Sequence, residues 1–104
     1  MRQEVIELGK LGPLPSSKTI IREQSGQQVI EKYENLIMSL DKPITDAEAR
    51  VLVKVLGSDD AFGLVWPLVH LIESAPGWPL DDCLLDPNNE WIQMLRQRAD
   101  NATR

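Results

Sequence analysis

The sequence predicts an all-α protein: a small helical bundle of about four helices with an irregular N-terminal arm. Apolar residues recur at three- and four-residue spacings after residue 26, capping residues precede these stretches, and Gly and Pro separate them. At 104 residues the chain has the size of one ordinary domain. We assign residues 1–25 to the arm and residues 26–104 to the helical domain.

The arm contains two short apolar clusters separated by the stretch "GKLGPLPSS". The density of Gly and Pro in this stretch excludes one continuous helix, and neither cluster alternates cleanly between apolar and polar residues. We therefore expect a loose hairpin or an extended arm, with room for one short strand.

The first two predicted helices follow from periodicity and capping. From Gln27 to Leu40 the apolar residues fall on one helical face, and Pro43 then disfavours further helix. Thr45 is followed three residues later by Glu48, the pattern of a capping box, in which each side chain accepts from a backbone N–H of the first turn. A second helix should begin there.

The third predicted helix, from Ala61 to Ser74, is apolar nearly all round and should lie at the centre of the bundle. Pro67 interrupts it, four residues after Gly63, so we expect either a kink or a break with Pro67 opening the main helix. A loop rich in turn formers leads to a last helix over residues 87–99.

The charge is unevenly distributed along the chain. The formal net charge is −5, and the segment between Lys54 and Arg96 contains seven acidic residues and no Lys or Arg. A negative surface there would repel phosphate backbones and attract a basic protein, so we expect a basic partner and no nucleic acid. The alternative is that these acids only keep the protein soluble.

Protein binding without catalysis is the preferred function. Trp78 stands between Gly77 and Pro79 and not on a helix, so we expect it to be the exposed tryptophan and the apolar anchor of an interface. The residues predicted to bind the partner are Asp59, Asp60, Trp78, Asp81, Asp82 and Asp86.

Two other functions remain open. A small enzyme would use His70 with Glu73, beside Trp66, as a general base; the same residues also fit a polar stripe at the bundle edge, and no catalytic residue is assigned. A structural homodimer would associate through an exposed apolar face of the first or last helix.

Metal and cofactor sites are not expected. The chain has one His and one Cys, too few for zinc, and its acidic loop lacks the ligand spacing of a calcium site. A glycine-rich phosphate loop is not found in the sequence either. With no signal-peptide pattern, no membrane-length apolar run and a single Cys, we expect a cytoplasmic protein that does not contact membranes.

The segment "PITDAEARVLVKVLGSDDAFGLVWPLVHLIESAPGWPL", followed by "NNEWIQMLRQRA", resembles a group of small acidic bacterial proteins of unassigned activity. The resemblance covers roughly residues 43–99 and rests on a Pro-Leu/Ile-Thr-acid helix start, a Gly-Leu-x-Trp-x-Leu-x-His helix, a Pro-x-Trp-Pro loop and a Trp-containing last helix. The type is similar to immunity and accessory proteins of bacterial toxin systems, which implies a protein partner and no catalytic residues.

Overall fold

The computed structural model describes residues 1–22, 24–57, 61 and 63–102, with all their side chains except those of residues 81 and 102. In these residues the protein is all helical, with six α-helices, one short 3-10 helix and no strand. The helices are α1 (Gln3–Leu11), α2 (Ser17–Arg22), α3 (Gly26–Met38), α4 (Asp46–Val53), α5 (Val65–Glu73), η1 (Asp81–Cys83) and α6 (Glu90–Ala102). The radius of gyration, 13.4 Å, is that of a compact globule of this length.

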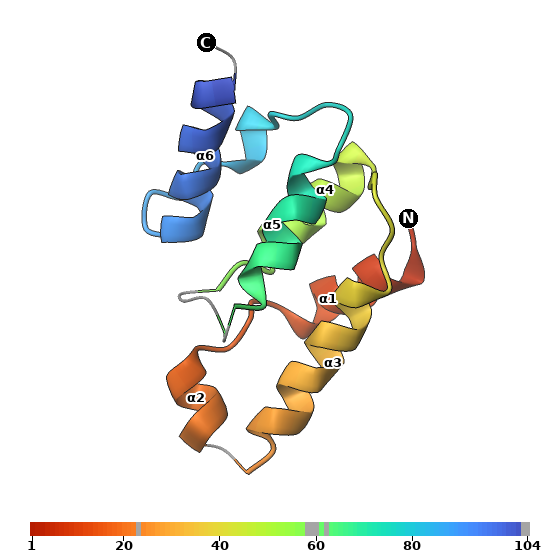
Figure 1. Cartoon of the computed structure of the whole chain (residues 1–104), viewed down its shortest axis with the longest axis vertical. Coiled ribbons are helices and arrows are strands. Elements are labelled where there is room, and N and C mark those ends of the chain that lie inside the picture. Colours follow the sequence, from red (N-terminus) through yellow and green to blue (C-terminus); the bar gives the residue numbers. More distant parts are fainter. Residues whose placement is uncertain (23, 58–60, 62, 103–104) are drawn as a thin grey trace.

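The helices are stacked along the longest axis of the molecule (Figure 1). Helix α2 lies at one end, α1 and α3 follow, α4 and α5 pack against each other in the middle, and α6 with η1 lies at the other end. Helix α1 contacts both α3 and α4, and α3 also reaches α5. One hydrophobic core therefore runs through the stack, from Leu8 through Ile37, Leu52 and Leu68 to Leu95.

The prediction of an irregular N-terminal arm is wrong, because residues 1–25 contain α1 and α2. Val5 and Leu8, one turn apart on α1, are both fully buried. In the sequence, Gly9 weakens the helix signal. In the structure, α1 and α4 approach so closely at this residue that a Cβ added to Gly9 would lie 3.0 Å from the Val51 side chain. Packing against α4 therefore favours the glycine that weakened the sequence signal.

The capping box at the start of α4 is confirmed and has a larger role than capping. The Glu48 backbone N–H donates to the Thr45 hydroxyl at 3.1 Å, and the Thr45 N–H donates to the Glu48 carboxylate at 2.9 Å. The Arg2 backbone N–H and Nε also donate to this carboxylate, at 3.1 and 3.3 Å. The Arg2 guanidinium further donates to the carbonyls of Asp41 and Pro43. Glu48 and Arg2 thus connect the start of α1, the α3–α4 connection and the start of α4.

Glu48 remains ionised although it is only 1% exposed. Burial alone would raise the pKa of this carboxyl, because it removes the charged form from water. The backbone N–H groups of Thr45 and Arg2 and the Arg2 guanidinium act in the opposite direction and lower the pKa from 4.5 to about 2. The carboxylate therefore stabilises the folded state as an anion.

Helices α5 and α6 both begin later in the chain than the stretches predicted for them. The third predicted helix breaks as one alternative proposed: α5 begins at Val65, and Pro67 lies in its first turn, where a missing N–H costs no helical hydrogen bond. Gly63 precedes it with a φ of 87°, which glycine adopts readily. Helix α6 begins at Glu90, later than expected, because Asn89 accepts the N–H groups of its first turn. No helix among the described residues is long and apolar enough to cross a membrane.

Acidification tests the Glu48 junction. A carboxyl whose folded pKa lies below its unfolded pKa stabilises fully above the unfolded value and loses this contribution as the pH falls through the folded value. The free energy of unfolding should therefore fall between about pH 4.5 and about pH 2, by about 3 kcal/mol from this group. Glu48→Gln should lower the free energy of unfolding at pH 7 by about 2 kcal/mol and flatten this decline.

Denaturant unfolding monitored by circular dichroism at a series of pH values measures this effect. Glu31→Gln is the matched control, because Glu31 is exposed on α3 and the change removes a carboxylate that is not part of this junction. Parallel pH profiles for the wild type and Glu48→Gln would contradict the assignment.

Candidate functional site

The structure places the predicted acidic residues in different environments. Asp59 and Asp60 lie outside the described residues, and so does the side chain of Asp81. Asp82 and Asp86 are both exposed, the first in η1 and the second in the loop before α6. Only these two can therefore be examined as part of an acidic surface.

Asp82 forms an ion pair with Arg50, which lies outside the acidic segment in the sequence. Arg50 Nε and Nη2, from α4, donate to the two carboxylate oxygens at 2.9 and 3.2 Å. Hydrogen bonding to Arg50 lowers the pKa of Asp82, so the carboxylate is held as an anion. The negative charge expected here is offset locally by Arg50.

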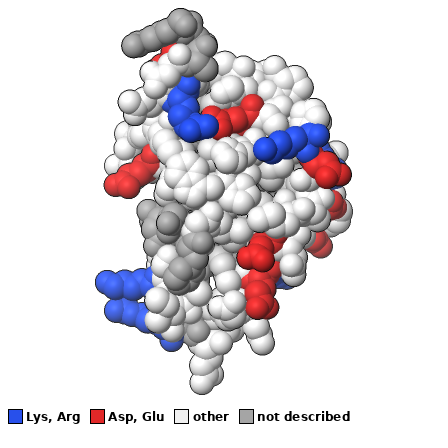
Figure 2. Space-filling view, viewed as in Figure 1, with Lys and Arg blue, Asp and Glu red and all other residues white. Residues whose placement is uncertain are grey.

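The negative charge of Glu73 is also offset by an arginine. Arg98 of α6 donates to both Glu73 carboxylate oxygens, at 2.7 and 2.9 Å. Hydrogen bonding to Glu73 raises the pKa of Arg98. His70 lies one turn earlier on α5 and is exposed. Glu73 is thus directed toward α6 and its oxygens are engaged there. Acidic and basic side chains alternate over this face of the molecule (Figure 2).

The exposed tryptophan is Trp66 and not Trp78, so that expectation is wrong. Trp66 is 41% exposed on α5, and its ring meets the edge of Trp91 at a centroid distance of 5.4 Å. Trp78 is half-buried against the core. The Gly77 N–H donates to the Asp46 carboxylate at 2.7 Å, which draws the turn holding Trp78 onto the start of α4.

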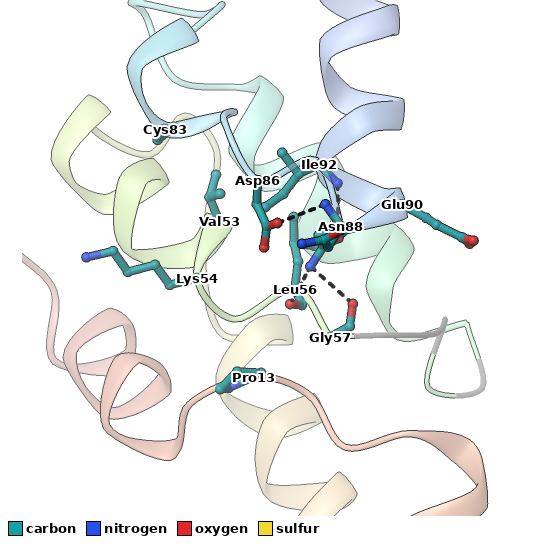
Figure 3. A pocket seen from close by; sticks show the side chains of 11 residues that line it. Pro13, Val53, Lys54, Leu56, Gly57, Cys83, Asp86, Asn88, Glu90 and Ile92 are labelled. Carbon is teal, nitrogen blue, oxygen red and sulfur yellow. Dashed lines mark hydrogen bonds between the residues drawn. The ribbon is translucent and has the colours of Figure 1, made fainter.

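Of the predicted acidic residues that the structure describes, Asp86 lines a cavity (Figure 3). We call this cavity of 610 Å³ the loop pocket; it lies between the end of α4, the α1–α2 connection and the loop before α6. Its lining is Pro13, Val53, Lys54, Leu56, Gly57, Cys83, Asp86, Asn88, Asn89, Glu90 and Ile92. A volume of this size falls within the range of ligand sites in proteins.

Asp86 is held in a fixed position in the loop pocket. Its carboxylate accepts from the Asn88 backbone N–H at 2.9 Å, and its own carbonyl accepts from Gln93 Nε2 at 2.8 Å. In Figure 3 the carboxylate points toward the middle of the lining residues, whereas Lys54 and Glu90 point outward. The pocket therefore presents one oriented carboxylate beside apolar side chains.

Asn89 joins the two walls of the pocket, which the sequence reasoning missed. Its side-chain amide donates to the Leu56 carbonyl at 3.1 Å and to the Gly57 carbonyl at 3.4 Å. Its side-chain oxygen accepts the N–H groups of Trp91 and Ile92 at 2.9 and 3.1 Å. Asn is a preferred helix N-cap residue, so this signal was present in the sequence, although the last helix was expected to begin at residue 87.

A second concave surface, which we call the α3–α5 groove, runs between those two helices. It consists of two adjoining hollows of 430 and 420 Å³ that share Met38 and Pro67. The first is lined by Gln27, Ile30, Glu34, Met38, Ala61, Gly63, Leu64 and Pro67. The second is lined by Ile37, Met38, Leu40, Lys42, Trp66, Pro67, His70 and Leu71. The alternative site of Trp66 and His70 thus lies in this groove, while Glu73 does not line it.

Among the described residues, no group of three or more His, Cys, Asp or Glu side chains is arranged to hold a metal ion. No protein family, no curated protein and no solved structure matches the chain. The loop pocket and the α3–α5 groove are two concave surfaces that contain predicted site residues.

The role of Asn89 in shaping the loop pocket is testable. Asn89→Ala removes two hydrogen bonds to the carbonyls of Leu56 and Gly57 and two from the first turn of α6, and should lower the free energy of unfolding by about 2 kcal/mol. Asn88→Ala is the matched control, because only the backbone N–H of Asn88 contacts Asp86. Denaturant unfolding of both variants measures the difference, and equal losses would show that Asn89 does not join the walls.

Proposed function

We propose that this protein is a non-catalytic protein-binding module whose loop pocket receives a Lys or Arg side chain from a basic partner. The observation that carries the proposal is the Asp86 carboxylate, held by Asn88 and directed into a pocket with apolar walls. Of the acids predicted to bind the partner, Asp82 already has a cationic partner within the chain. Asp86 therefore becomes the central residue of the proposed contact.

The lining of the pocket suits a long basic side chain. Lys and Arg carry an apolar stem and a charged end, and they bury the stem against apolar surface while the end contacts an anion. Val53, Leu56 and Ile92 offer the apolar contacts and Asp86 the anion. A charge-assisted hydrogen bond to a carboxylate is about twice as strong as one between neutral groups.

The overall charge of the protein favours the same partner. With a net charge of −5, the chain attracts cationic proteins over distances longer than a direct contact, which speeds encounter more than it strengthens the complex. In its specific form, the proposal is an immunity-type protein of the bacterial cytoplasm that covers a basic face of a toxin. This specific form rests on the sequence resemblance and on size and charge.

We do not propose an enzyme that uses His70 and Glu73. Such an enzyme needs Glu73 to orient or share a proton with His70. Both Glu73 oxygens accept from Arg98 instead, at 2.7 and 2.9 Å.

Paired binding assays test the pocket directly. Tagged wild-type protein should retain basic proteins from its own cell extract at low salt and release them at high salt, and Asp86→Asn should retain far less. A short lysine peptide should likewise shift the NMR signals of Val53, Leu56 and Ile92, whereas the same peptide with acetylated lysines should not. Acetylation removes the charge and keeps most of the stem.

Glu90→Gln is the matched control, because it removes one negative charge from the same pocket at a side chain that points outward (Figure 3). Retention should survive this change if the contact depends on Asp86. If Asp86→Asn retains basic proteins as well as the wild type does, Asp86 does not bind the partner and the proposal is wrong.

A further inference from the structure

The α3–α5 groove combines two exposed apolar side chains with an apolar floor. Met38 is 62% exposed and Trp66 is 41% exposed, while Ile30, Ile37 and Leu71, which line the floor, are buried. Met and Trp are enriched at protein interfaces because they offer large apolar area, and Met adapts its shape to a partner.

Among the described residues that line the groove, the charged side chains lie on opposite sides of its midpoint. Along α3 the lining runs from Gln27 through Glu34 to Met38, and then continues to Lys42. Along α5 the lining runs in the same direction, from Gly63 through Pro67 to His70. The half that begins at Gln27 thus contains Glu34, and the half beyond Met38 and Pro67 contains Lys42 and His70. Glu34, Lys42 and His70 are all exposed and available to a partner.

We propose that a second copy of this chain packs on the α3–α5 groove across a twofold axis that passes near Met38 and Pro67. A twofold axis places the same surface on both sides and reverses its direction. Glu34 of each protomer then faces Lys42 and His70 of the partner subunit, so the twofold axis creates two Glu34–Lys42 pairs. Met38 and Trp66 near the axis project into the partner's groove, where the buried floor excludes water from the contact.

The charge arrangement favours a second copy over an unrelated protein. An unrelated partner would have to carry a basic group opposite Glu34 and an acidic group opposite Lys42, in the right order, on one apolar strip. The chain itself carries this complement on the same strip. The first predicted helix corresponds to α3, so this dimer uses one of the two helices expected for a homodimer and adds α5 to the contact.

The dimer is independent of the proposed function. Within the part of the chain that the structure describes, no residue lines both the loop pocket and the α3–α5 groove, so Asp86→Asn should leave dimerisation unchanged. Changes in the groove should likewise leave binding of a lysine peptide in the loop pocket unchanged. The failure of one proposal is therefore distinguishable from the failure of the other.

Sedimentation velocity tests the dimer over protein concentrations from about 1 μM to about 1 mM, the span of weak to moderate dissociation constants. The wild type should rise from the monomer mass of 11.7 kDa toward twice that mass. Met38→Lys should remain monomeric, because it places a charge near the axis of an apolar contact. Glu34→Lys and Lys42→Glu should each weaken dimerisation about tenfold, since each replaces two attractions by two repulsions.

The double variant Glu34→Lys with Lys42→Glu separates a paired contact from general charge effects. It restores opposite charges across the axis and should recover most of the wild-type association. Val29→Lys is the control for Met38→Lys, because Val29 is 39% exposed on the same helix and does not line the groove. A wild type that stays monomeric at about 1 mM would overturn the proposal. So would a double variant no better than the singles, or a loss of association in Val29→Lys equal to that in Met38→Lys.

Discussion

The buried carboxylate of Glu48 is the constraint on which the arrangement of α1, α3 and α4 depends. A buried anion is tolerated only where hydrogen-bond donors replace its water, and here the donors come from Thr45 and from Arg2, 46 residues away in the sequence. Arg2 also binds the carbonyls of Asp41 and Pro43, so one polar junction fixes the start of α1 and the α3–α4 connection relative to α4. Helix α1 can then pack against both α3 and α4, and the core extends from there to α5.

The two concave surfaces follow from this stack. Helices α3 and α5 both border the core but contact each other only in part, and the space between them is the α3–α5 groove. The loop pocket forms at the other end of α4, where Asn89 ties the loop before α6 to the carbonyls of Leu56 and Gly57. One surface presents an oriented carboxylate, and the other presents an apolar strip with opposite charges on its two halves. The first suits a single basic side chain, and the second suits a broad, self-complementary contact.

The electrostatics of the surface are more local than the sequence suggests. The segment between Lys54 and Arg96 contains no cation, yet Arg50 from before it and Arg98 from after it contact its acids Asp82 and Glu73. Such exposed pairs contribute little to stability, but they remove two acids from any open negative surface. Asp86 differs because its hydrogen-bond donor is a backbone N–H, which adds no opposing charge. This difference gives Asp86 its place in the proposed contact.

The sequence by itself determined the helical class, the positions of α3 and α4 and the capping box, because each depends on residues one or two turns apart. Only the tertiary structure decided that α1 is a helix, since Gly9 and the prolines after it weaken the local signal and packing against α4 overrides it. It also decided that Trp66 is exposed and that Arg50 meets Asp82 across 32 residues of sequence. Such pairings depend on how helices far apart in the chain are brought together, and no local pattern carries that information.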